Sequence, residues 1–230
     1  MCEIIEEVKK NDVALTLSIG EKTFEEYKAY REAGADRYLL RIETTDENLY
    51  KKLHPYSELK NRIKCLENIK ELGFEVGTGI MTGLPEQSIE SIADDILFFK
   101  ELDADMIGIG PYIVHPQTPL KNSKNGDFNL ALKTMAITRI LMRDINIPAT
   151  SAMETLNPNG RIIALQSGAN VVMPNVMSTE YRAKYEIYPG KICINEDSDK
   201  CRTCVENKIK SIGRTISDDF GFHIRKDVNP

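Results

Sequence analysis

The sequence predicts an α/β fold in which a parallel sheet curves into part of a β/α barrel, with about six of eight strands present. Two observations predict it. An amphipathic helix, a small or acidic breaker and a short apolar run recur in that order, with breakers at Gly34, Gly73, Asp103 and Gly168. Glycine suits a helix C-cap that turns the chain toward the next strand. The apolar runs are short and apolar on both faces, which is typical of a parallel sheet covered by helices.

The elements follow in order along the chain. We expect strands near 13–19, 37–43, 75–82, 105–110, 147–152 and 169–173, and helices near 23–33, 58–72, 88–102, 127–143 and 159–167. The opening segment CEIIEEVKKN has a helical pattern, and no strand precedes it. We expect the partial barrel to span residues 1–178 and to be followed by a C-terminal extension over 179–230.

An open doubly wound sheet and a β/α barrel both fit this alternation, and both bind ligands at the carboxyl ends of their strands. Here every predicted strand is followed by polar or conformationally special residues. They are Thr16, Ser18, Glu21, Arg41, Glu43, residues 82–86, residues 111–119, Thr150, Ser151, Pro174 and Asn175. An open sheet needs only one or two such loops, so six converging strand ends favour the barrel.

Composition excludes several classes of protein. The chain has 230 residues and a formal net charge of -5, with lysines and arginines scattered along it, so nothing suggests a nucleic-acid partner. No run approaches the roughly 18 apolar residues of a membrane span, and the N-terminus carries acids where a signal peptide has a basic region. We therefore expect a soluble, cytoplasmic protein with no membrane partner.

Three of the five cysteines form a C-x7-C-x2-C pattern at Cys193, Cys201 and Cys204. The x2 pair lets two thiolates bind one metal, and the x7 loop can return a third, so the pattern favours an iron-sulfur or zinc site. Three unrelated thiols, or an oxidised pair, remain as alternatives. Cys2 and Cys65 lack partners, and Cys65 falls on the apolar stripe of a predicted helix, as a buried structural cysteine would.

Arg41 and Glu43 end the second predicted strand and point to the same side of it, because strand side chains alternate. The guanidinium could hold a carboxylate bidentately, and the carboxylate could hold an ammonium group or ribose hydroxyls. A structural ion pair fits equally well. The strand exit GIMTGLPEQ, His115 in its loop, and Tyr181, Tyr185 and Tyr188 are weaker signals, and each also has an ordinary structural explanation.

Read together, six segments resemble one family. They are GADRYLLRIET, GIMTGLPEQ, GIGPYIVHPQTPL, IPATSAM, GANVVMPN and YPGKIC followed by Cys-x2-Cys. In this order they are similar to the radical S-adenosylmethionine (SAM) maturases of [FeFe]-hydrogenase, in the biotin synthase-like branch of the radical SAM superfamily. The likeness runs from about residue 4 to 215.

The resemblance implies a TIM-type barrel, SAM as cofactor and a [4Fe-4S] cluster whose open iron binds it. Cleavage then gives methionine and a 5'-deoxyadenosyl radical, which acts on a small cysteine-bound iron carbonyl cyanide precursor, with other hydrogenase maturation proteins as partners. Cofactor-binding positions match Thr16, Ser18, Arg41, Glu43, Arg62 and Met81. Substrate-binding positions match Arg37, Met106, Thr150, Ser151, Met173, Tyr185 and Tyr188. Cys193, Cys201 and Cys204 match an accessory second iron-sulfur cluster.

One departure from the family is large. The defining C-x3-C-x2-C is absent from the 230 residues, as are the first two strands. We therefore expect an N-terminally truncated chain that is inactive alone, because those cysteines are all the protein ligands of the cluster. The rival enzyme interpretation is a biotin synthase or methylornithine synthase-type radical SAM enzyme. The rival from another class is a non-catalytic barrel that binds iron-sulfur or zinc through the Cys193 group.

Overall fold

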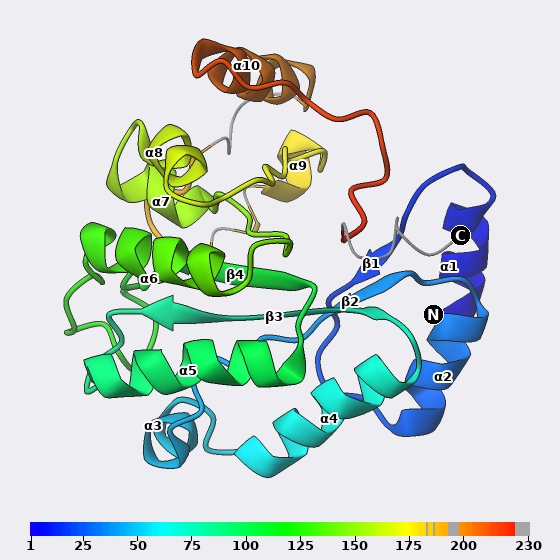
Figure 1. Ribbon diagram of the computed structural model, residues 1–230, viewed down its shortest axis with the longest axis horizontal. Coiled ribbons are helices and arrows are strands. Elements are labelled where there is room, and N and C mark those ends of the chain that lie inside the picture. Colours follow the sequence, from blue (N-terminus) through cyan, green and yellow to red (C-terminus); the bar gives the residue numbers. More distant parts are fainter. Residues whose placement is uncertain (183, 186, 193–197, 224–230) are drawn as a thin grey trace.

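The structure, a computed structural model, describes residues 1–182, 184–185, 187–192 and 198–223, without the side chains of 198–201. Its strands are β1 (Thr16–Leu17), β2 (Arg37–Leu39), β3 (Glu75–Thr82) and β4 (Met106–Pro111). Its helices are α1 (Cys2–Lys9), α2 (Phe24–Glu32), α3 (Glu47–Leu53), α4 (Leu59–Glu71), α5 (Ile89–Leu102), α6 (Phe128–Leu141), α7 (Ser151–Leu156), α8 (Gly160–Gln166), α9 (Thr179–Arg182) and α10 (Ser198–Ser211). Helices and strands alternate through β4 and α6 as predicted, except that the additional helix α3 precedes α4 between β2 and β3 (Figure 1).

The four strands form one parallel sheet in the order β1-β2-β3-β4. Single parallel bridges continue it, from Met106 to Asn146 and from Pro148 to Val171. Strand order therefore follows chain order around an arc, with helices α4 and α5 beside β3 and α6 beside β4 (Figure 1). This arrangement is a partial β/α barrel, as the sequence predicts.

The last two predicted strands are much shorter than expected. Residues 147–152 and 169–173 each contribute one bridge instead of a strand. The first of these predictions is wrong at its end because Ser151 already starts α7, with Thr150 in extended conformation as its N-cap. Helices α3, α7, α9 and α10 were not predicted from the sequence.

Side-chain caps fix where the longer helices begin. Thr23 and Glu26 form a reciprocal capping box at α2, while Ser88 and Asp127 cap α5 and α6 through the backbone N–H three residues on. At the other end, the predicted breakers have positive φ, including Asp103 at 52° after α5. These caps confirm the helix boundaries that the sequence indicates, and they set the residue at which the chain leaves each helix for the next strand.

The two faces of the sheet differ in side-chain size. Ile107 and Ile109 are fully buried against the outer helices, whereas Gly108 and Gly110 alternate with them on the inner face. A Cβ at Gly79 of β3 would lie 2.1 Å from the carbonyl oxygen of Gly108, so β3 and β4 can approach this closely only through glycine. The inner face is thus left open for side chains from the strand ends.

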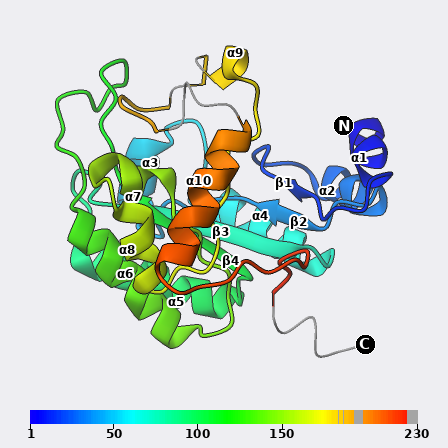
Figure 2. The same cartoon turned by 90° about the horizontal axis from the view of Figure 1, so that it is seen from above.

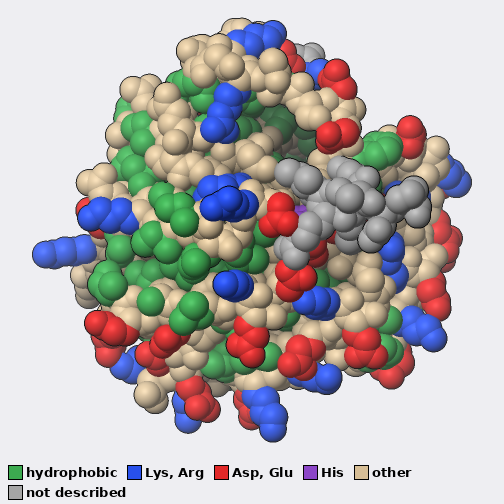
Figure 3. Space-filling view, in the orientation of Figure 1, with side chains coloured by type: hydrophobic (Ala, Val, Ile, Leu, Met, Phe, Trp, Pro, Cys, Tyr) green, Lys and Arg blue, Asp and Glu red, His purple; other side chains and the backbone are tan. Residues whose placement is uncertain are grey.

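Helix α10 lies near α7 and α8 (Figures 1 and 2). An ion pair joins Lys208 of α10 to the buried Glu154 of α7, which also pairs with Arg161 of α8 at 3.2 Å. On the face seen in Figure 3, acidic and basic side chains are interspersed, which agrees with the scattered charge of the sequence. Within the described part of the chain, no helix has the length and apolar character needed to cross a bilayer.

Candidate functional site

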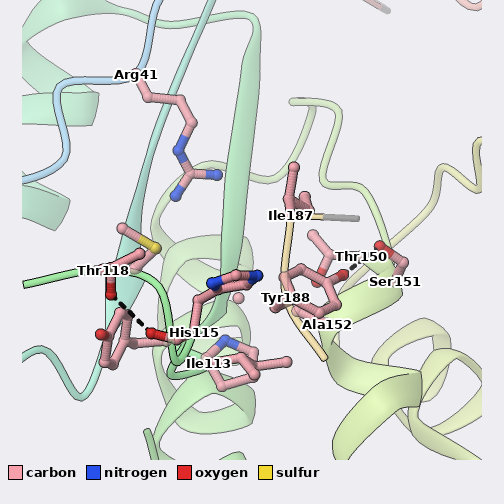
Figure 4. Close-up of a pocket in the computed structure, with 13 residues that line it drawn as sticks. Arg41, Ile113, His115, Thr118, Thr150, Ser151, Ala152, Ile187 and Tyr188 are labelled. Atoms are coloured by element: carbon pink, nitrogen blue, oxygen red, sulfur yellow. Dashed lines mark hydrogen bonds between the residues drawn. The ribbon is translucent and has the colours of Figure 1, made fainter. Parts of the chain in front are cut away.

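A cavity of about 420 Å³ opens at the carboxyl ends of the strands. Its walls come from the end of β2, from β3, from β4 and the loop after it, from the start of α7 and from the segment after α9 (Figure 4). The lining residues are Arg41, Met81, Gly110, Pro111, Tyr112, Ile113, His115, Thr118, Thr150, Ser151, Ala152, Ile187 and Tyr188. The volume falls within the range of roughly 300–1,000 Å³ usual for small-molecule sites.

Arg41 and Glu43 form an ion pair at the edge of this cavity. Nε of Arg41 donates to Oε1 of Glu43 at 2.9 Å, so the two side chains share a side as predicted, although β2 ends at Leu39 and Glu43 has a left-handed φ of 66°. The second polar groups of the pair, Nη2 of Arg41 and Oε2 of Glu43, are buried without a hydrogen-bond partner among the described residues. Buried polar atoms are nearly always satisfied, so this pair has unused capacity for one donor and one acceptor on a ligand.

Gly108 makes room for this arginine. A Cβ at Gly108 would lie 3.3 Å from Nη1 of Arg41, and one at Gly110 would lie 2.9 Å from Oγ1 of Thr150. The two glycines are two residues apart on β4 and therefore share its inner face. Glycine at these positions lets polar side chains from the segment after β2 and from the start of α7 lie directly over the strand.

Arg62 of α4 supports the Arg41 backbone. Its Nε donates to Oε1 of Glu21 at 2.5 Å and its Nη1 to the carbonyl oxygen of Arg41 at 2.6 Å. Burial opposes ionisation of Glu21, but hydrogen bonds from Arg62, Ser57 and Asn61 outweigh it, so the pKa of Glu21 is lowered and the pair stays ionic. Arg62 is therefore bound to protein groups and does not line the cavity, although the resemblance matches it to a cofactor-binding position.

The opposite wall carries hydroxyl groups. Oγ of Ser151 and the hydroxyl of Tyr188 are 2.7 Å apart, and Oγ1 of Thr150 is buried with no partner in the described residues. Figure 4 shows these three residues across the cavity from Arg41. A ligand between the walls would meet a cation on one side and hydroxyl groups on the other.

His115 also lines the cavity, although its sequence context favours an ordinary loop histidine. Its Nδ1 accepts a hydrogen bond from the backbone N–H of Gln117 at 3.1 Å, and its carbonyl accepts one from Oγ1 of Thr118. These bonds form a local turn within the loop after β4. Ile187, which the sequence did not single out, completes the wall beside Tyr188.

Several residues matched through the resemblance lie away from the cavity. Thr16 and Ser18 are exposed on and after the edge strand β1, and Met173 and Tyr185 are 58% and 60% exposed. Arg37 and Met106 begin β2 and β4, at the amino ends of the strands. Arg37 donates from Nε to Oε2 of the buried Glu75 at 2.6 Å and so forms an ion pair with it. Arg37 lies four residues before Arg41, which corresponds to about 13 Å of extended chain.

The cysteine group falls at the limit of the described residues. Cys193 lies outside them, Cys201 lies in α10, and Cys204 is an exposed free thiol on the same helix. Cys65 is buried, as the apolar stripe predicts. The described part of the chain contains no cluster of three or more His, Cys, Asp or Glu that could hold a metal.

Comparison with known proteins decides the family. Residues 1–99 match the family model described as the radical SAM superfamily. The [FeFe] hydrogenase maturase subunit HydE of Thermotoga maritima is 53% identical over 219 residues, which cover 95% of this chain and 63% of that protein. The chain belongs to the radical SAM superfamily. Its sequence is HydE-like, and it spans less than two thirds of the length of that relative.

Other similarities agree with this placement. The 3-methylornithine synthase of Methanosarcina acetivorans is 32% identical over 68% of this chain and 45% of that protein. The crystal structure of methylornithine synthase (PylB) superposes with a TM-score of 0.77 at 24% identity, covering 94% of this chain and 63% of that one. A structure of HydG, a maturase of the [FeFe]-hydrogenase, gives a TM-score of 0.64 at 16% identity over 74% of this chain and 41% of that one. The structural likenesses establish the fold, a partial TIM-type barrel.

Membership in the radical SAM superfamily implies SAM and a [4Fe-4S] cluster as cofactors. The residues of this chain fit SAM but not the cluster. SAM presents an amino acid zwitterion, and the unpartnered Nη2 of Arg41 and Oε2 of Glu43 match its carboxylate and ammonium groups. The [4Fe-4S] cluster has no such match, because the five cysteines contain no C-x3-C-x2-C.

Proposed function

We propose that this chain supplies the SAM-binding wall of a HydE-type radical SAM enzyme. The observation that supports it most is the Arg41–Glu43 pair, in which one buried donor and one buried acceptor lack partners at the edge of a cavity of about 420 Å³. Beside a reduced [4Fe-4S] cluster held elsewhere in such an enzyme, bound SAM would accept one electron and supply a 5'-deoxyadenosyl radical, with methionine as the other product.

The residues at the cavity have two roles in this proposal: some bind the polar groups of SAM, and others enclose its adenosine. Arg41 donates to the carboxylate of the cofactor and Glu43 accepts from its ammonium group, while Arg62 holds the Arg41 backbone in place. Met81 and the loop after Gly110 pack against the adenosine. Apolar lining residues such as Ile113 and Ile187 exclude water, which protects a reactive species from side reactions.

The substrate side of the proposal rests on the similarity to HydE. We propose that a small cysteine-bound iron carbonyl cyanide complex binds against Thr150, Ser151 and Tyr188, which lie across the cavity from Arg41 (Figure 4). Other hydrogenase maturation proteins would deliver or receive it. Cys193, Cys201 and Cys204 would hold an accessory second cluster, outside the cavity.

The test is an anaerobic assay for 5'-deoxyadenosine after reconstitution with iron, sulfide and a reductant. We expect no turnover by the 230-residue chain, because it lacks the three thiolates of the radical SAM cluster. The same chain extended upstream through a C-x3-C-x2-C segment should turn over, and the cysteine-bound iron carbonyl cyanide complex should stimulate it. Turnover by the 230-residue chain alone, or none by the extended protein, would contradict the proposal.

A further inference from the structure

Glu43 has a backbone conformation that few glutamates adopt. Its φ is 66°, in the left-handed region where the Cβ of an L-residue crowds the following carbonyl group. It sits past the end of β2 and is joined to β3 only by a bridge to Ile80, with its N–H donating to the carbonyl oxygen of Gly79 at 3.1 Å. Such strain persists only where the surroundings hold the residue in place.

The residues after Glu43 are held by helix α5. The backbone N–H of Thr45 donates to Oδ1 of Asp95 at 2.5 Å, and the hydroxyl of Thr45 donates to the same oxygen at 2.8 Å. Thr44 is fully buried, and its hydroxyl lies 3.3 Å from that of Ser91, one helical turn before Asp95. Two side chains of α5 therefore fix the chain directly after the strained residue.

Burial of the Asp95 carboxylate destabilises the folded state. Asp95 is 0% exposed, its Oδ2 has no hydrogen-bond partner among the described residues, and no cation within the described chain forms an ion pair with it. Desolvation by this burial raises the pKa of Asp95 to about 6. Alanine would suit the interior of α5 better, both as a helix former and as an uncharged side chain. A residue that costs stability in this way often serves a functional site.

We propose that Asp95 is a positioning residue for SAM binding, which anchors Thr45 and thereby holds Glu43 in the left-handed conformation that directs its carboxylate toward Arg41. The inference rests on the proposed function. It extends that function to a residue of α5 that does not line the cavity and, as proposed here, does not touch the cofactor.

The test compares four variants of the 230-residue chain by calorimetric titration with SAM, amide hydrogen exchange over residues 43–46 and thermal unfolding. Asp95→Ala should weaken SAM binding by about tenfold, as expected when the hydrogen bonds that set one ligand contact are lost. It should also speed exchange at Thr45, without lowering the unfolding temperature. Asp95→Asn keeps an acceptor oxygen and should bind SAM within about twofold of the wild type. Asp94→Ala, an exposed neighbour on the same helix, is the matched control and should leave SAM affinity and exchange at Thr45 unchanged.

Thr45→Val is the fourth variant and leaves α5 intact. It removes only the hydroxyl bond and should weaken binding in the same direction by a smaller factor, so it decides the matter if Asp95→Ala does not fold. Wild-type affinity and wild-type exchange in Asp95→Ala, or in Thr45→Val where the first does not fold, would overturn the positioning role and leave the proposed function standing. A wild-type chain that binds no SAM would instead overturn the proposed function, and the inference with it.

Discussion

Glu43 combines a strained backbone with the carboxylate proposed to bind SAM, and substitutions can separate the two. Glu43→Ala and Glu43→Gly both remove the carboxylate, but only glycine adopts a φ of 66° without crowding its neighbours. Relief of left-handed strain contributes roughly 1–2 kcal/mol, and the greater freedom of glycine in the unfolded chain offsets about 0.4–1 kcal/mol of it. The glycine variant should therefore be more stable than the alanine variant by about 1 kcal/mol.

Binding should respond differently from stability. Both variants lose a charge-assisted hydrogen bond worth roughly 1.5–3 kcal/mol, which corresponds to a loss of SAM affinity of about 10- to 150-fold. Glu43→Gln keeps an acceptor oxygen and should lose less than about tenfold, because a neutral acceptor forms a bond about half as strong.

Urea denaturation followed by circular dichroism measures the stability difference, and calorimetric titration with SAM measures affinity for all three variants. Equal stability of the alanine and glycine variants would show that no strain is stored at Glu43. Wild-type affinity in either of them would show that the carboxylate does not contact the cofactor and that the ion pair with Arg41 is structural.

Three other outcomes follow from the structure. Burial, with the charges of Asp94 and Asp46, raises the pKa of Asp95 from 3.8 to about 6, so the folded chain binds this proton more tightly and loses stability as pH rises from about 4 to 6. Asp95→Asn should remove that part of the decline in urea denaturation, and parallel stability curves for the two proteins would refute it. Gly79→Ala should lower stability more than Gly77→Ala. A Cβ at Gly79 would lie 2.1 Å from the Gly108 carbonyl oxygen, whereas at Gly77 the nearest atom is the flexible Met106 Cε at 2.9 Å. Equal urea denaturation midpoints for the two variants would contradict this prediction. After reconstitution with iron and sulfide, the chain should show thiolate-to-iron absorption that falls in the Cys201→Ser, Cys204→Ser double variant, and absorption that survives this change would exclude these cysteines as ligands.

The sequence predicts the central elements well because their signals are local. Helix α5 begins at the cap Ser88 and ends at the breaker Asp103, and β3 occupies residues 75–82 as expected. The strand predicted over 147–152 forms only the bridge at Pro148 and fails at its end, because Ser151 already begins α7, where Ala152 and Met153 suit a helix. An apolar run alone does not distinguish a short strand from a buried helix.

The candidate site likewise combines features that local sequence predicts with features that it does not. The sequence predicts that Arg41 and Glu43 share a side, and their hydrogen bond confirms the contact, although β2 ends at Leu39 and the left-handed φ of Glu43 breaks the alternation on which the prediction rests. The left-handed φ of Glu43 and its support by Asp95 depend on contacts 50 residues apart in the sequence, between Thr45 and Asp95, which no local pattern reports. Likewise, the contact between Arg62 and Glu21 joins residues 41 apart in the sequence, and no local pattern predicts it.

The central claim is that the carboxyl-end cavity binds SAM through Arg41. Calorimetric titration of the wild-type chain, Arg41→Ala and Arg143→Ala with SAM tests it most directly, since Arg143 is an exposed arginine remote from the cavity lining. The wild type and Arg143→Ala should bind one SAM per chain with equal affinity, and Arg41→Ala should bind it about 10- to 150-fold more weakly. Equal affinity of all three proteins, or no binding by the wild type, would contradict the claim.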